Sequence, residues 1–409
     1  MQKINREVPK GRVEGSFDAR YQTVADAFIK NFTDYDEVGA SVCLKVGGET
    51  MVDMWGGRVA PDSDRPWQSD TVSIIFSSTK GATALCAHIL ADRGLLDLDA
   101  PVAQYWPEFA CNGKEKATVR MMLDHSVGVP VLRDPLPRGA VNNWDLMCER
   151  LAAQAPFWEP GLRHGYHALT IGWTVGELVR RVSGKSLGTF FQDEVAKPLG
   201  LDFWIGTPES VEPRISPMLA FDIGSLAERS PMGIRAMADR NSVPGLFLFN
   251  DGGFEPNTRA CHAAEIGAAN GISNARGLAG MYAPLACGGT AQGVKLVGRD
   301  TIARMGQVAS ASHLDETLCV PTRFSLGYMK SMDNRKMGNF ANMLLSERAF
   351  GHVGAGGSIG FADPECGLSF GYTMNRMGEG LLMNERGQGL IDATYRVLGY
   401  TSNAGGVWI

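Results

Sequence analysis

The sequence predicts an α+β protein in which one antiparallel sheet, built from both ends of the chain, is flanked by helices. Residues 40–46 and 49–55 are rich in β-forming residues and flank a Gly-Gly pair, which is typical of a hairpin. Residues 357–362 and 368–374 flank a second turn rich in Asp, Pro and Gly. Between these hairpins, residues 118–200 have mostly helical patterns. A mainly helical region is therefore inserted between the two parts of the sheet.

Individual helices follow from apolar spacing. Residues 17–32 carry apolar side chains at helical intervals, which predicts an amphipathic helix. Residues 77–93 are rich in Ala, Leu and Ile and are followed by glycine, a common helix end. The clearest helices of the inserted region are expected at residues 144–155 and 171–183. The pattern of residues 391–398 predicts a terminal helix.

This order divides the chain into two regions. Residues 1–76 and 280–409 form the predicted sheet region, residues 77–279 form the helical region, and we expect the active site between them. Residues 211–259 are rich in Pro, Gly, Met and Phe and have weak periodicity. We interpret them as long irregular loops that line the pocket, because loops of this length usually carry function.

Composition excludes several classes of function. The 409 residues are 44% hydrophobic and 20% charged, as in soluble globular proteins, and the net charge is −5. The sequence contains no block of Lys and Arg of the kind that predicts a nucleic-acid partner. It also contains no apolar run long enough to predict a membrane span. The first residues lack the apolar stretch of a secretory signal, so the sequence predicts a cytoplasmic protein. The cysteine and histidine spacings predict neither metal nor cofactor, and a homo-oligomer is compatible with the sequence.

The first chemical candidate is an SxxK motif, Ser77-Ser-Thr-Lys80, at the start of a predicted helix. At i,i+3 the serine and the lysine share one helix face, where a partly desolvated amine can hold or accept the hydroxyl proton. Free N–H groups at a helix start also suit a developing oxyanion. The alternative is an ordinary N-cap, and such a short motif also arises by chance.

A second candidate, Gly356-Gly-Ser358-Ile-Gly360, matches the GxSxG pattern. That motif requires a helix after the serine and a histidine later in the chain. The residues after Ser358 predict strand and turn, and the last histidine, His352, precedes it. Ser358 is therefore not expected to be a nucleophile, and these glycines are interpreted as positions of close packing.

Two weaker candidates remain. Tyr166 follows a Pro-Gly turn and precedes a helix, so its phenol is a candidate functional group, although a buried packing role is the common alternative. The glycine-dense residues 351–357 allow backbone N–H groups to approach a ligand closely. The alternative for this segment is a bulged structural strand, and His352 alone is more often structural than catalytic.

Taken in this order, the motifs resemble the serine β-lactamase and penicillin-binding-protein superfamily, and most closely its class C β-lactamase-like carboxylesterases, the family VIII esterases. The resemblance extends from about residue 20 to residue 400. Beyond the motifs it rests on four stretches, namely Ala91-Asp-Arg-Gly-Leu-Leu-Asp-Leu-Asp-Ala-Pro-Val, Met122-Leu-Asp-His-Ser-Val-Gly-Val-Pro, Asn270-Gly-Ile-Ser-Asn-Ala-Arg and Phe361-Ala-Asp-Pro.

The resemblance implies roles for specific positions. Ser77 is similar to the acylated nucleophile and Lys80 to its proton-sharing partner. Tyr166 matches the tyrosine of the family's Tyr-x-Asn element. His352-Val-Gly354 matches the Lys-Thr-Gly strand, and the N–H of Ala355 joins that of Ser77 as the implied oxyanion hole.

Two departures from the family pattern concern the substrate. Ala168 stands where the lactamase pattern has asparagine, and His352 replaces the lysine that offers a cation to a β-lactam carboxylate. Both changes favour neutral esters over penicillins and cephalosporins. The residues we expect around the substrate are His352, Gly354, Gly356, His167, Phe247 and Phe249. The apolar residues of the long loops suggest a hydrophobic acyl or alcohol group, with an oligomer contact as the alternative; they include Met218, Phe221, Met232, Leu246, Phe247 and Phe249.

The expected reaction is hydrolysis of a small, mainly apolar ester through an acyl-enzyme on Ser77. Tyr166 with Lys80 takes the serine proton, and we expect the Lys80 cation to lower the pKa of Tyr166 from about 10. The alternatives are a β-lactamase, DD-peptidase, amidase or acyltransferase of the same superfamily, or an inactive homologue acting as a binding scaffold. The presence of Ser77, Lys80 and Tyr166 together argues against the scaffold.

Overall fold

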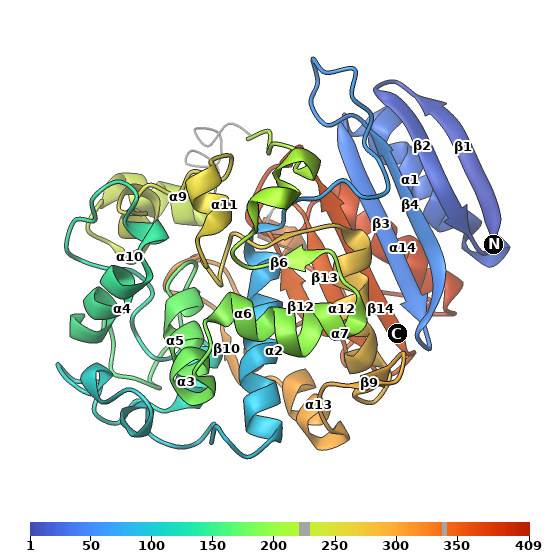
Figure 1. Ribbon diagram of the computed structural model, residues 1–409. Helices are drawn as coiled ribbons and strands as arrows, with labels where there is room; N and C mark the ends of the chain where they lie inside the picture. Colours follow the sequence, from blue (N-terminus) through green and yellow to red (C-terminus); the bar gives the residue numbers. More distant parts are fainter. Residues whose placement is uncertain (221–229, 338–341) are drawn as a thin grey trace.

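The computed structural model describes residues 1–220, 230–337 and 342–409. Its centre is a seven-stranded antiparallel sheet with the strand order β1-β2-β4-β3-β14-β13-β12 (Figure 1). The N-terminal strands are β1 (Gln2–Val8), β2 (Gly11–Phe17), β3 (Gly39–Val46) and β4 (Glu49–Gly57), and the C-terminal strands are β12 (Phe350–Val353), β13 (Ile359–Asp363) and β14 (Leu368–Met374). Because β3 pairs with β14, the two ends of the chain form one sheet, which confirms the predicted α+β architecture.

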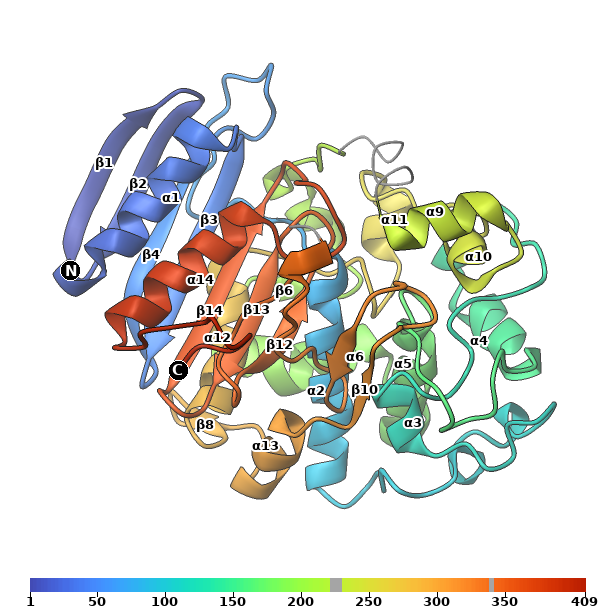
Figure 2. The ribbon, with the colours of Figure 1, turned by 180° about the vertical axis from the view of Figure 1, so that it is seen from behind.

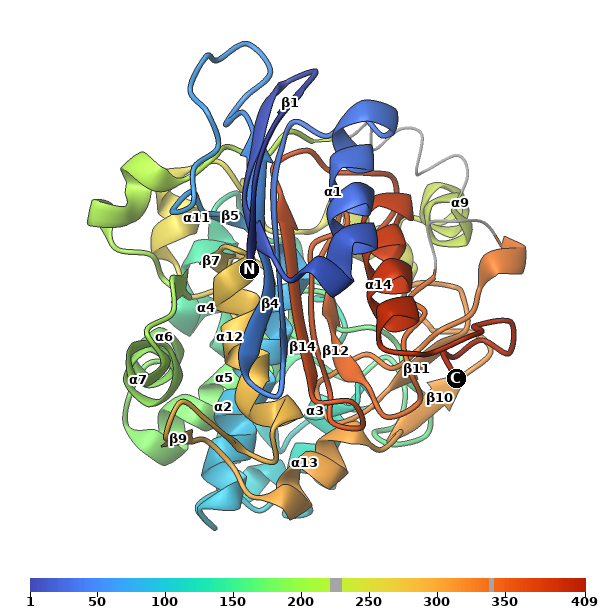
Figure 3. The same cartoon turned by 90° about the vertical axis from the view of Figure 1, so that its right-hand side faces the viewer.

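Helices cover both faces of this sheet. On one face α1 (Gln22–Asp34) and α14 (Glu385–Val397) pack side by side, and on the other lies α12 (Ala275–Ala286) (Figures 2 and 3). Glycine lets α12 approach closely, since a Cβ at Gly371 of β14 would lie 2.2 Å from the backbone oxygen of Ala275.

The inserted region is mainly helical. Its central helix α2 (Thr79–Asp92) is buried along nearly its whole length, which explains why its sequence is apolar on every side. Two helices pack against it, α5 (Ile171–Ser183) and α6 (Leu187–Phe191), and α5 in turn contacts α3 (Val119–Leu123) and α4 (Trp144–Ala153). The predicted helices of this region are confirmed, and α5 has the predicted bounds.

Short elements complete the fold. Three small sheets are formed by β5 (Ser73–Ile74), β7 (Ile272–Ser273) and β6 (Phe203–Trp204), by β8 (Thr290–Ala291) and β9 (Val294–Lys295), and by β10 (Ser310–Ser312) and β11 (Thr322–Phe324). The remaining short helices include α7 (Lys197–Leu199), α11 (Arg259–Ala263) and α13 (Arg299–Gly306). No helix in the described ranges is both long enough and apolar enough to cross a membrane.

The prediction for the first residues was wrong in one respect. Residues up to Phe17 form the hairpin of β1 and β2, and α1 begins only at Gln22, after a turn capped by the Asp18 carboxylate. The exposed strand β1 contains mostly polar residues. The hairpin is stabilised because β1 pairs with β2 and β2 pairs with β4. It forms although its sequence lacks the alternating apolar pattern that predicts a strand.

The prediction that residues 211–259 lack regular structure was also wrong, apart from residues 221–229, which lie outside the described residues. The segment contains α9 (Pro231–Ala238) and α10 (Val243–Phe249). Each helix follows a serine whose hydroxyl accepts a backbone N–H, from Gly233 to Ser230 at 3.0 Å and from Gly245 to Ser242 at 3.2 Å. Serine caps with proline in the first turn are a signal that identifies both helix starts.

Candidate active site

Ser77 lies in a 3₁₀ turn, Phe76–Ser78, that leads directly into α2. The residue before it, Phe76, has a φ of +44°, in the left-handed region that non-glycine residues rarely adopt. Such a conformation costs about 1–3 kcal/mol and persists where the surrounding structure enforces it, often at a functional site. Nothing in the sequence indicates this strain.

Lys80 holds the Ser77 side chain from one turn further along α2. Its Nζ lies 2.9 Å from the Ser77 Oγ, 2.6 Å from the carbonyl oxygen of Ala168 and 2.9 Å from that of Ala268. Lys80 is only 1% exposed, and burial lowers the pKa of its amine well below 10.5. A neutral amine has two N–H bonds and one lone pair. The two carbonyls accept the N–H bonds, and the lone pair is left for the Ser77 proton.

Tyr166 is the third member of the group: it lines the same cavity as Ser77, and the Ser77 side chain is close enough to its phenol to favour ionisation. Its ring stacks on Phe324 and His352, each with ring centres 5.9 Å apart, and the Lys80 Nζ lies 4.8 Å from the ring centre. Burial raises the pKa of Tyr166, so the expectation that Lys80 lowers it was wrong. The reason is that desolvation of a fully enclosed phenol opposes its ionisation. A protonated phenol is suited to donate a proton.

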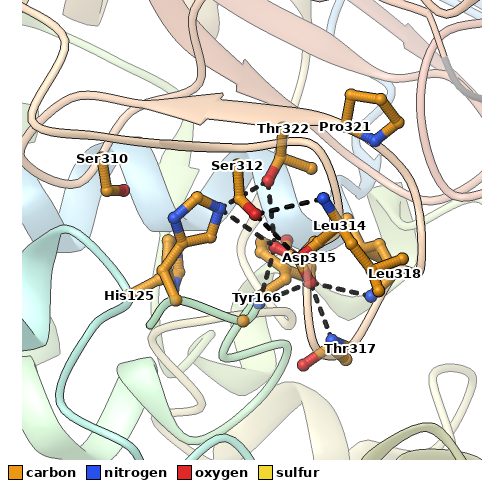
Figure 4. A network of polar contacts seen from close by, with 12 residues as sticks. His125, Tyr166, Ser310, Ser312, Leu314, Asp315, Thr317, Leu318, Pro321 and Thr322 are labelled. Atoms are coloured by element: carbon orange, nitrogen blue, oxygen red, sulfur yellow. Dashed lines mark hydrogen bonds and ion pairs between the residues drawn. The ribbon is translucent and has the colours of Figure 1, made fainter. Parts of the chain in front are cut away.

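A buried carboxylate, that of Asp315, holds the backbone of Tyr166 (Figure 4). Its oxygens accept the N–H of Tyr166 at 2.9 and 3.1 Å, the N–H groups of Thr317 and Leu318 at 2.8 Å each, and the Thr322 hydroxyl at 3.1 Å. Asp315 lies between β10 and β11, far from Tyr166 in sequence and outside any motif. Sequence reasoning missed it, and no local signal identifies it.

The turn between β12 and β13 lies against the segment that precedes Ser77. The Ser358 hydroxyl donates a hydrogen bond to the backbone oxygen of Ile75 at 2.8 Å, and a Cβ at Gly354 would lie 2.2 Å from the same oxygen. This contact brings Ala355 to the cavity that Ser77 lines. Within the described residues neither the Ser77 N–H nor the Ala355 N–H has an acceptor. Both are therefore free for the oxyanion that the sequence predicts there.

The glycines and the serine of the GxSxG match have structural roles. Ser358 is fully buried, which agrees with its rejection as a nucleophile. Gly356 has a φ of +81°, and a Cβ there would lie 2.7 Å from the Met377 side chain. Neither Gly354 nor Gly356 is among the residues that line the cavity, so their contribution is to backbone shape.

The cavity above Ser77 has a volume of about 520 Å³ and a mostly apolar lining. Its lining consists of Phe76, Ser77, Tyr166, Ala168, Leu169, Met237, Phe247, Leu248, Phe249, Asp251, Phe254, Ala269, Ala355 and Leu381. Phe247 and Phe249 of α10 line it, as expected from the sequence. Met237, Leu248 and Phe254 also come from residues 211–259, the segment expected to line the pocket, whereas Leu169 and Leu381 come from segments that the sequence did not single out. Met218, Met232 and Leu246 do not line this cavity, and Phe221 lies outside the described residues.

The two histidines expected around the substrate lie elsewhere. His167 is fully buried: its Nδ1 donates to the Gly165 oxygen at 2.7 Å and its Nε2 accepts the Val129 N–H at 3.1 Å. Burial lowers the pKa of His167 to about 3. His352 is also fully buried, and its Nδ1 lies 2.8 Å from the Val353 oxygen. Burial lowers the pKa of His352 well below 6.5, so this position holds a neutral ring. Neither residue is part of the cavity wall.

A serine and a buried lysine at the start of a central helix, beside a tyrosine and the edge of an antiparallel sheet, define the serine hydrolases with the β-lactamase-like fold. The chain belongs to the Beta-lactamase family, whose model matches residues 25–393.

Similar proteins cover nearly the whole chain. The esterase/β-lactamase LipL of Mycobacterium tuberculosis (strain ATCC 25618 / H37Rv) is 36% identical over 387 residues, which is 91% of this chain and 85% of that protein. The crystal structure of a family VIII carboxylesterase is 38% identical, with a TM-score of 0.83 over 94% of this chain and 99% of that one. A penicillin-binding-protein homologue from Caulobacter crescentus has the same TM-score and coverage at 32% identity.

Proposed function

We propose that this enzyme hydrolyses small, mainly apolar carboxylic esters through an acyl-enzyme on Ser77. One observation carries the proposal: the Ser77 Oγ lies 2.9 Å from the buried Lys80 Nζ and lines an apolar cavity of about 520 Å³. The relatives named as an esterase and a carboxylesterase support the same reaction. The two-region division, with residues 1–76 and 280–409 around residues 77–279, is part of this proposal, and the cavity draws its walls from both regions.

In the first half-reaction the neutral Lys80 amine accepts the Ser77 proton while the Oγ attacks the ester carbonyl carbon. The N–H groups of Ser77 and Ala355 stabilise the oxyanion, each contributing about 3 kcal/mol. The bond to the leaving alcohol then breaks. Its oxygen receives a proton from the Tyr166 hydroxyl, which regains one from the Lys80 ammonium.

In the second half-reaction water attacks the acyl carbon and gives a proton to Lys80. The bond between the acyl carbon and the Ser77 oxygen then breaks. The Ser77 oxygen takes the proton back from Lys80, and the carboxylic acid is released. If an alcohol replaces water in this step, the same acyl-enzyme gives acyl transfer, so the acyltransferase alternative differs only in the final acceptor.

The β-lactamase and peptidase alternatives require contacts to the amide and the carboxylate of the substrate, and this site offers those contacts less well. Ala168 has no side-chain amide, and the fully buried ring of His352 provides no cation for a substrate carboxylate. Neutral esters need neither contact, which favours them.

The proposal is tested by measuring hydrolysis of p-nitrophenyl acetate and butyrate and of nitrocefin, with labelling by a fluorophosphonate. We expect ester turnover, little nitrocefin turnover and a mass shift on Ser77. The Ser77→Ala variant loses turnover and labelling, whereas Ser210→Ala, a control at an exposed serine that does not line the cavity, keeps both. Full ester turnover by Ser77→Ala would exclude the proposed nucleophile, and absence of labelling would favour the scaffold. The cytoplasmic location and the homo-oligomer stay predictions from the sequence.

A further inference from the structure

The apolar cavity above Ser77 carries one carboxylate in its wall, that of Asp251. Asp251 follows α10 and is half-buried, and its Oδ1 accepts the Gly253 N–H at 2.9 Å. In the described part of the chain its Oδ2 has no hydrogen-bond or ion-pair partner. This residue of a mostly apolar wall therefore has one carboxylate oxygen that no described group pairs.

Among the residues that the structure describes, no basic side chain lines this cavity. Of the arginines on neighbouring segments, Arg138 pairs with Glu255, and Arg240 lies over the Phe249 ring at 4.3 Å. Asp251 is therefore the one charged residue among the described lining residues, and apolar surroundings screen its charge less than water does.

We propose that Asp251 makes this site selective for esters that carry a cationic ammonium group and against esters that carry a carboxylate. This inference rests on the proposed ester hydrolysis and names its substrate class. A cation bound in the cavity neutralises the Asp251 charge, whereas an anion is repelled by it and finds no basic partner among the lining residues.

The test compares substrates that differ in charge and little in shape. On the alcohol side, butyrylcholine is paired with its neutral isostere, 3,3-dimethylbutyl butyrate. On the acyl side, p-nitrophenyl 4-(trimethylammonio)butanoate is paired with its neutral isostere, p-nitrophenyl 5,5-dimethylhexanoate, and both are compared with the p-nitrophenyl monoester of glutaric acid. We expect the cation-to-neutral ratio of kcat/KM to exceed the anion-to-neutral ratio in the wild-type enzyme.

The Asp251→Asn variant keeps an acceptor for the Gly253 N–H and removes only the charge. It should lower the cation-to-neutral ratio of at least one pair by about tenfold, the effect of one partly screened charge. Added salt should lower the same ratio in the wild type. Asp239→Asn is the matched control, because the exposed Asp239 also accepts a backbone N–H two residues on, from Asn241 at 2.9 Å, and does not line the cavity.

Two outcomes would overturn these conclusions separately. If the wild type hydrolyses neutral esters but Asp251→Asn leaves the charge ratios of both pairs unchanged, or changes them no more than Asp239→Asn does, the charge selection is wrong. If the wild type hydrolyses none of the esters, the proposed function itself fails.

Discussion

The Nζ of Lys80 lies 2.9 Å from the Oγ of Ser77, and the lysine that makes this contact is 1% exposed. Two backbone carbonyls and the serine are the hydrogen-bond partners of its amine, and burial is the only cause of its lowered pKa. A lysine in this state acts as a base over a pH range in which an exposed lysine remains protonated.

The first prediction concerns pH. Since only the neutral Lys80 amine accepts the Ser77 proton, kcat/KM for p-nitrophenyl acetate should rise with pH through the lowered Lys80 pKa. It should reach its plateau well below the ordinary 10.5. Lys80→Arg, which stays charged, should lower kcat/KM by about a thousandfold at all pH values measured. Lys80 is not the base if Lys80→Arg keeps the wild-type kcat/KM, or if the kcat/KM of the wild type rises only near pH 10.5.

The second prediction separates Tyr166 from Lys80. Tyr166→Phe removes the hydroxyl beside Ser77 but keeps the ring that stacks on Phe324 and His352. We expect kcat to fall about a hundredfold or more, because the leaving alcohol loses its proton donor. The melting temperature should change little, and the rise of kcat/KM with pH should persist because it belongs to Lys80. Loss of that rise would instead make Tyr166 the base.

Asp315 should act as a positioning residue. Asp315→Ala leaves the N–H groups of Tyr166, Thr317 and Leu318 without their buried acceptor, and we expect the free energy of unfolding to fall by about 3 kcal/mol. Asp315→Asn keeps an amide oxygen for these donors and should fold with a smaller loss. In that variant kcat should fall more than KM changes. An Asp315→Asn enzyme with wild-type kcat would show that Tyr166 needs no such support.

Phe247 should limit the length of the acyl chain or alcohol. A second cavity of about 20 Å³ adjoins the main one, and Leu169, Phe247 and Asp251 line both. Removing the ring in Phe247→Ala should join them, so that substrates longer by two methylenes gain about tenfold in relative kcat/KM. A series of p-nitrophenyl esters from acetate to octanoate measures this change. Phe249→Ala, which opens only the main cavity, should keep the original optimum, and equal shifts in both variants would refute a specific role for Phe247.

Local patterns in the sequence predicted much of the framework. The hairpins of β3–β4 and β13–β14 and the helices α2 and α5 follow from turn residues and apolar spacing, which act over a few neighbouring residues. Serine and lysine at i,i+3 share a helix face wherever that helix forms, so the relation between Ser77 and Lys80 could also be predicted. The β1–β2 hairpin could not be predicted in this way, because β1 has a polar sequence and depends on pairing with its neighbours.

The sequence alone therefore determined the fold class, the family resemblance and the three residues Ser77, Lys80 and Tyr166. Only the tertiary structure decided the environment in which they act. It raised the pKa of Tyr166 where the sequence suggested a decrease, placed Asp315 on the Tyr166 backbone, and set Asp251 in the cavity wall. The physical reason is that desolvation, charge and cavity shape depend on segments distant along the chain, whereas spacing and turn chemistry act between neighbours.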